Sequence, residues 1–231
     1  MSRTSSMRTD TDGRAARCLR RHFVACRLSR RRAHRPMPTS AASRKPARHG
    51  GHPVALYWVV GQAAWLAAVH GGAHADPVPG WLCAAGMASW HLSRAARPSV
   101  EASSILAVTL LGWCWDSVLA ETGWLVYPGH PAGALGAPAW IAALWAIFAI
   151  QLNVVFVRLR GRPWLAAMLG ALAGPLSFRA GAALGAVSFA PPAAAFAALA
   201  AGWAVLLPAA VQVARYRDGM APLPRQAGEE Q

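Results

Sequence analysis

Apolar residues fill six segments of the chain between Pro53 and Tyr216, and short polar or turn-rich stretches separate them. A bilayer core of about 30 Å requires roughly 20 apolar residues in a helix that crosses it. The pattern therefore predicts an all-α membrane domain, residues 53–216, built as an integral bundle of six transmembrane helices. The expected helices are 53–69, 80–92, 103–127, 138–157, 163–189 and 192–214.

Positive charge is distributed unevenly between the loops. Alternate loops carry Arg94, Arg97, Arg158, Arg160, Arg162, Arg215 and Arg217, whereas residues 71–79, 127–137 and 190–192 contain no Lys or Arg. Arginine collects in the cytoplasmic loops of membrane proteins. The asymmetry therefore predicts that both termini are cytoplasmic and that residues 217–231 form a short cytoplasmic tail.

The formal charge of +14 belongs mainly to residues 1–50, which hold 14 of the 23 Lys and Arg residues. A stretch so polar is expected to be disordered. Arg30–Arg32 could bind anionic lipid head groups. An Arg-rich arm could also bind nucleic acid non-specifically; no specific nucleic-acid partner is expected. An equal alternative is that Met37 is the natural start and that part of this tail is not translated.

No motif indicates a metal, a cofactor or a catalytic centre. The four cysteines lack disulfide or metal-ligand spacing and are expected to be free; they are Cys18, Cys26, Cys83 and Cys114. His70 and His74, with Asp76 nearby, could form an outer zinc site, but the Gly71–Gly72 pair is expected to break the helix between them. The chain has no glycine-rich phosphate loop and no H-E-x-x-H motif.

Ionisable side chains inside apolar segments are the main candidates for function, because a charge in a bilayer needs a partner. At 1.5 Å per residue, Asp116 and Arg179 lie about 20 and 24 Å from the cytoplasmic ends of their helices. They are therefore expected to be able to pair, with Glu121 as an alternative partner for Arg179. Such a pair could be a static tie or a substrate or proton site. Gly112, one turn before Asp116, leaves room for a helix or a small ligand.

Asn153 and Gln151 are polar residues in the fourth segment. Trp145, Ala149 and Asn153 follow each other at helical spacing. Asn153 is therefore expected to point inward and to form hydrogen bonds between helices, either as structural glue or in a ligand site.

The fifth segment combines small residues with a proline. Gly170 and Gly174, and likewise Gly181 and Gly185, are four residues apart, which predicts flat faces for close helix packing. Pro175 is expected to kink this helix, and the Ser177 hydroxyl could satisfy the freed backbone groups. A hinge, or a broken helix that lines a cavity, is the functional alternative.

Several of these features together resemble an uncharacterised bacterial membrane family, domain of unknown function 2878 (DUF2878), from about Tyr57 to Tyr216. The residues that carry the resemblance are Gly112, Asp116, Ala137–Trp140, Leu144, Trp145, Phe148, Asn153, Gly174–Phe178, Gly181, Leu184–Ala186, Trp203 and Pro208. Phe178 stands where the family usually has tyrosine. The resemblance implies a compact helical protein of the bacterial inner membrane and brings no known activity.

Three function classes follow from these observations. A small transporter or permease-like protein would use Asp116, Arg179 and Asn153 around the fifth segment. A membrane scaffold or accessory subunit would use the same groups as structural ties. An intramembrane enzyme is the third class. A transporter predicts a water-accessible cavity at Asp116, whereas a scaffold predicts a dry, packed one. Substrate and oligomeric state do not follow from the sequence.

Overall fold

The computed structural model describes residues 51–131 and 133–221. The expectations for the Arg-rich tail, the alternative start at Met37 and the last ten residues lie outside these ranges. The described ranges contain all six of the apolar segments that the sequence predicts as helices.

The described residues form six α-helices and three short elements. The helices are α2 (Gly51–Ala73), α3 (Val78–Leu92), α4 (Pro98–Glu121), α5 (Ala139–Leu152), α6 (Pro163–Ala183) and α7 (Pro192–Tyr216). The short elements are strand β1 (Leu125–Val126), 3-10 helix η1 (Phe156–Leu159) and strand β2 (Ser188–Phe189). Proline occupies the first position of α4, α6 and α7, where its missing N–H has no helical acceptor in any case. The predicted helical class is confirmed.

Four of the helices are long and apolar enough to cross a membrane. These candidate spans are Val54–Ala73, Pro98–Glu121, Pro163–Ala183 and Pro192–Tyr216. Helix α3 has 15 residues and α5 has 14, which corresponds to about 22 and 21 Å. Both are shorter than a bilayer core, so six complete spans remain a prediction.

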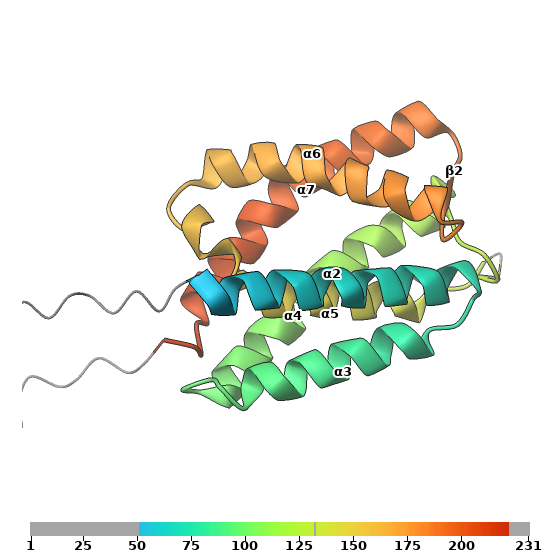
Figure 1. Ribbon diagram of the computed structural model, residues 1–231. Coiled ribbons are helices and arrows are strands. Elements are labelled where there is room, and N and C mark those ends of the chain that lie inside the picture. The colour runs from blue at the N-terminus through green and yellow to red at the C-terminus, as the bar shows by residue number, and fades with distance from the viewer. Residues whose placement is uncertain (1–50, 132, 222–231) are drawn as a thin grey trace, which may run out of the picture. The chain divides into compact units, whose positions relative to one another are not determined.

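Helix α5 is the centre of the bundle. It packs against α2, α3, α4 and α7, while α6 packs mainly against α7. In Figure 1, α6 and α7 lie above α2, and α3 lies below it. Ile141, Ile147 and Ile150 of α5 are almost completely buried. A short helix is tolerated in this place because neighbouring helices, rather than lipid, surround it.

Two helices end earlier than predicted, and both are followed by a strand. The segments predicted as 103–127 and 163–189 end as helices at Glu121 and Ala183. Gly123 and Gly185 follow with positive φ angles of 74° and 81°, and the amide of the next residue bonds back to Leu119 and Gly181, respectively. This helix-ending motif favours glycine. It turns the chain into β1 and β2, which pair antiparallel, with Leu125 opposite Phe189.

Other helix boundaries also differ from the prediction, among them the ends of α2 and α5. Helix α2 continues through Gly71 and Gly72 to Ala73, so the expected break between His70 and His74 is wrong. A Cβ at Gly72 would lie 2.5 Å from the Trp140 ring, which shows that this glycine serves close packing. Helix α5 ends at Leu152 instead of Val157, and Asn153 follows as its C-cap.

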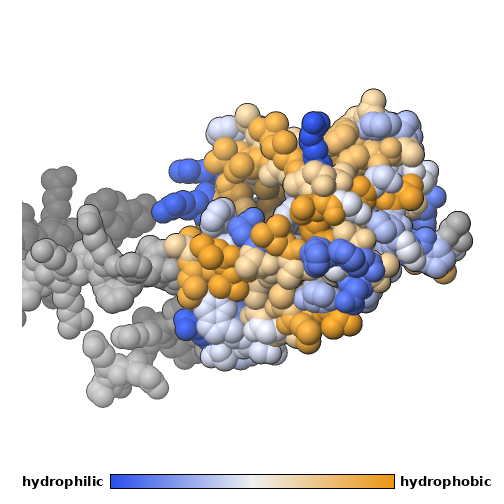
Figure 2. Space-filling view, turned by 45° about the vertical axis from the view of Figure 1, so that its right-hand side comes forward, coloured by the Kyte–Doolittle hydropathy of each residue, from blue (hydrophilic) through white to orange (hydrophobic). Residues whose placement is uncertain are grey.

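All arginine-bearing loops lie at one end of the bundle. Figure 1 shows the start of α2 and the loops after α3 and α5 at one end, and β2 and the remaining loops at the other. Figure 2 shows apolar residues over much of the side between these ends. Trp164, Leu172 and Leu176 of α6 are each more than 60% exposed. An apolar surface of this kind suits contact with lipid.

Candidate functional site

Asp116 is a buried acid in α4, and its side chain is 1% exposed. Its Oδ2 accepts a hydrogen bond of 2.7 Å from the indole N–H of Trp145 on α5. Its Oδ1 has no hydrogen-bond partner among the described residues. An unsatisfied buried polar atom costs about 1–3 kcal/mol. The free oxygen is therefore able to accept a hydrogen bond from a ligand or to hold a proton.

A cavity of about 110 Å³ lies beside Asp116. It is lined by Trp65 of α2, Asp116 of α4, Ile141, Leu144, Trp145 and Phe148 of α5, Ser177 and Phe178 of α6, and Trp203 of α7. This volume is enough for several water molecules or a small organic group. Helices α2 and α6 both contribute to the lining but do not pack as neighbours.

Two stacked indole rings hold the donor of Asp116 in place. The rings of Trp145 and Trp203 are 4.7 Å apart and inclined by 15°. A Cβ at Gly112 would lie 1.9 Å from the Trp145 ring, and one at Gly174 would lie 2.2 Å from the Trp203 ring. Each of the two tryptophans therefore packs closely against a glycine. The sequence predicted that Gly112 leaves room for a helix or a small ligand, and in the structure the Trp145 ring occupies this space.

The predicted partners of Asp116 lie elsewhere. Arg179 is exposed on α6, and the salt bridges among the described residues, His91–Glu101 and Arg160–Asp218, do not include it. Helix α6 packs against α7 rather than α4, which separates Arg179 from Asp116. Glu121 accepts a hydrogen bond of 3.1 Å from the Gly136 amide. The structure therefore forms neither of the ion pairs that the sequence allowed.

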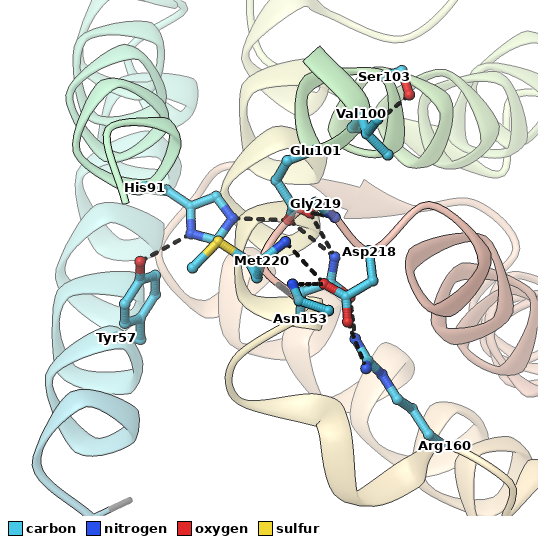
Figure 3. Close-up of polar contacts among 11 residues, drawn as sticks. Tyr57, His91, Val100, Glu101, Ser103, Asn153, Arg160, Asp218, Gly219 and Met220 are labelled. Carbon is cyan, nitrogen blue, oxygen red and sulfur yellow. Dashed lines mark hydrogen bonds and ion pairs between the residues drawn. The ribbon is translucent and has the colours of Figure 1, made fainter. Parts of the chain in front are cut away.

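Asn153 belongs to a second polar cluster, at the arginine-bearing end of the bundle, with Glu101 at its centre (Figure 3). The Glu101 side chain is 1% exposed. It accepts hydrogen bonds from His91 Nε2 at 2.9 Å, from Asn153 Nδ2 at 2.9 and 3.0 Å, and from the Gly219 amide at 2.8 Å. The Tyr57 hydroxyl bonds the other nitrogen of His91 at 2.9 Å. Both carboxylate oxygens of Glu101 are thus satisfied within the protein.

The residues after α7 close this cluster. Asp218 Oδ2 forms a salt bridge with Arg160 Nη1 at 2.8 Å. Its Oδ1 accepts hydrogen bonds from the amides of Met220 and Ala221. The Arg97 amide donates to the Gly219 carbonyl at 2.9 Å. Arg160 in turn donates to Asn153 Oδ1. Residues 218–221 are therefore tied to the start of α4 and to the segment that follows α5.

The glycines and the proline of α6 have separate roles. Gly170 and Gly174 lie against Trp203 of α7, so this spacing serves helix packing. Gly185 follows the helix end, and the expected Gly181–Gly185 helix face is wrong. Pro175 lies inside α6.

A family model described as a protein of unknown function (DUF2878) matches residues 55–209. The chain belongs to the DUF2878 family. Comparisons with curated proteins and with solved structures gave no significant match. Every residue that lines the Asp116 cavity lies inside the DUF2878 match, whereas Asp218 and Gly219 lie beyond it. The cavity is therefore built entirely from the family domain.

Sequence reasoning missed Glu101 and His91 in this DUF2878 chain because it placed the start of the third helix at Ser103 and left Glu101 in a loop. A helix that begins at Pro98 puts Glu101, Val108 and Gly112 on the same buried face as Asp116. The signal was Pro98 followed by an acid in the first turn, a usual helix start. His91 had no comparable signal, because its partners Glu101 and Tyr57 lie on other helices, and the sequence does not show which faces of these helices meet.

Proposed function

We propose that this protein is a multi-pass protein of the bacterial inner membrane, with both termini cytoplasmic, that acts as a small transporter or permease. Its ligand binds in the cavity beside Asp116. The observation that supports this proposal is the unpartnered Oδ1 of a buried carboxylate in a cavity formed by five helices.

The two acids of α4 provide an internal comparison. Glu101 makes all its hydrogen bonds within the protein, as a purely structural group should. Asp116 is equally buried and lines the cavity, but one of its oxygens has no partner among the described residues. A retained unsatisfied carboxylate inside a membrane domain is costly, and such groups mark substrate or proton pathways.

The cavity defines the chemistry of the ligand. A carboxylate attracts a hydrogen-bond donor, a cation or a proton. Ile141, Leu144 and Phe148 give the remaining wall an apolar character. The best fit is a small protonated amine with a short apolar body. Its ammonium would donate to Oδ1, and no cation–π contact with Trp145 or Trp203 is required.

Uptake into proteoliposomes tests this function. Radiolabelled methylammonium should enter vesicles that contain the wild-type protein, and acetate should not. Asp116→Asn should lower uptake at least about tenfold, because a hydrogen bond to a charged group contributes roughly 1.5–3 kcal/mol. Arg179→Gln, which removes an exposed charge that does not contact the cavity, should leave uptake unchanged. Equal uptake by the wild type, Asp116→Asn and empty vesicles would exclude amine transport.

Access to the cavity separates a transporter from a scaffold. Cys18, Cys26, Cys83 and Cys114 are first replaced by serine or alanine, and Ser177→Cys is introduced into this background. A small maleimide should label the new thiol, and methylammonium should slow the labelling. A thiol that stays unlabelled in the folded protein would indicate the dry packing of a scaffold.

A scaffold or accessory subunit is the second candidate. The observation in its favour is the rigid stack of Gly112, Trp145, Trp203 and Gly174, which joins four helices. An intramembrane enzyme comes third, because the described residues that line the cavity place no histidine or cysteine beside Ser177.

A further inference from the structure

A second concave surface lies between α2 and α3, away from the Asp116 cavity. It is a groove of about 340 Å³, lined by Leu56 and Val60 of α2, by Gly86, Met87 and Trp90 of α3, and by Arg94 in the turn that follows α3. On α3, Gly86 and Trp90 are four residues apart and therefore share one helix face, and Arg94 follows in the turn after the helix, over the Trp90 ring. The groove thus begins with apolar side chains and ends at a cation.

Arg94 is positioned as a binding group at this end. Its guanidinium carbon lies 4.9 Å from the centre of the Trp90 ring. Arg94 is exposed and takes part in neither of the salt bridges among the described residues. A guanidinium placed over an indole ring keeps N–H groups that can donate to a phosphate.

The apolar part of the groove is open because of a glycine. A Cβ at Gly86 would meet no atom within 4 Å, so close helix packing does not explain this glycine. Leu56 is 50% exposed on the facing helix. An acyl chain would cover this apolar surface.

We propose that the α2–α3 groove binds one anionic phospholipid, with an acyl chain over Gly86 and the phosphate on Arg94. A basic side chain at the mouth of an apolar groove between membrane helices suits an anionic lipid head group. The site is separate from the Arg-rich segment at residues 30–32 and does not depend on the transport proposed above.

Native mass spectrometry of the detergent-purified protein tests this site. Phosphatidylglycerol and phosphatidylcholine with identical acyl chains are added in turn. Phosphatidylglycerol should bind about fivefold more tightly, which corresponds to one arginine near a membrane surface. Arg94→Gln should remove this preference. Arg158→Gln, which removes another exposed arginine from the same end of the bundle, should keep it.

A second substitution tests whether the apolar part of the groove binds the lipid. Gly86→Leu places a side chain in the groove at a position where a Cβ meets no atom within 4 Å, so it should fold and should lose the first bound lipid of either type. Inorganic phosphate at millimolar concentration should not displace phosphatidylglycerol. Equal affinity of the wild type for the two lipids, an equal loss in Arg158→Gln, unchanged binding in Gly86→Leu or full displacement by phosphate would each overturn the proposal.

Discussion

Some buried polar atoms of this protein have a hydrogen-bond partner among the described residues, and others have none. Glu101 and Asp116 are both buried on α4, yet Glu101 is surrounded by donors and Asp116 has an oxygen without one. The Tyr127 hydroxyl is likewise buried without a partner among the described residues. Unpartnered atoms destabilise the fold. Substitutions at single residues can therefore separate groups that stabilise the protein from groups that serve another role.

Tyr127 gives a prediction with a defined pH dependence. Burial, and secondarily the charge of Asp116, raise the pKa of Tyr127 well above its ordinary value. In the unfolded chain the tyrosine hydroxyl has a pKa of about 10. Above this pH the unfolded chain releases the Tyr127 proton, whereas the folded protein retains it. The contribution of Tyr127 to the free energy of unfolding is fully present below about pH 10. It is lost as the pH rises toward the pKa of Tyr127 in the folded protein.

Tyr127→Phe should remove both the unpaired hydroxyl and this alkaline loss. We expect the variant to gain about 1 kcal/mol of unfolding free energy at neutral pH, with a shallower decline from about pH 9 to 11. Unfolding in detergent, followed by circular dichroism, measures both effects. Tyr216→Phe is the matched control, because Tyr216 is 81% exposed. A decline with pH as steep as that of the wild type would contradict the role of Tyr127.

At the scale of the helices, the indole stack explains why glycine is needed at particular positions. Gly112→Ala would place a methyl group inside the Trp145 ring. We expect a loss of about 1–3 kcal/mol of unfolding free energy from overpacking, together with a shift in the tryptophan fluorescence as Trp145 moves from Asp116. Gly86→Ala is the control, because open space surrounds that glycine and alanine favours a helix. Equal stability of the two variants would argue against a tight stack.

The sequence was sufficient for the helices but not for their ends or their neighbours. Hydrophobic length and proline positions predicted where α6 and α7 begin. The early ends of α4 and α6 follow from Gly123 and Gly185, and the pairing of β1 with β2 that comes after them joins segments about 60 residues apart. Asp116 and Arg179 lie at similar distances from the cytoplasmic ends of their helices, which suggested an ion pair. These distances do not show which helices are neighbours. In the structure α6 packs on α7, so Arg179 does not reach Asp116. The partner of Asp116 is Trp145 on α5, which a comparison of depths in the membrane could not identify.

The two ends of the bundle are closed by different contacts. At one end β1 and β2 join the loops after α4 and α6. At the other end the Glu101 cluster joins α3, α4, the end of α5 and residues 218–221. The Asp116 cavity is formed by helix side chains and shares no residue with the Glu101 cluster. A change at the arginine-bearing end should therefore release residues 218–221 while the centre of the bundle stays packed.

Gly219 is the position where this separation can be tested. A Cβ at Gly219 would lie 2.5 Å from the Arg97 carbonyl oxygen and 2.6 Å from Glu101 backbone and side-chain atoms. Gly219→Ala should therefore displace residues 218–221, remove a donor from Glu101 and break the Arg160–Asp218 pair. Hydrogen exchange should rise at least about tenfold at the amides of Gly219, Met220 and Ala221, which corresponds to a local loss of roughly 1.4 kcal/mol. The amides of α5 should keep their protection, and Gly86→Ala should change neither region. If exchange rises equally in α5, the contacts of residues 218–221 support the whole bundle rather than one end of it.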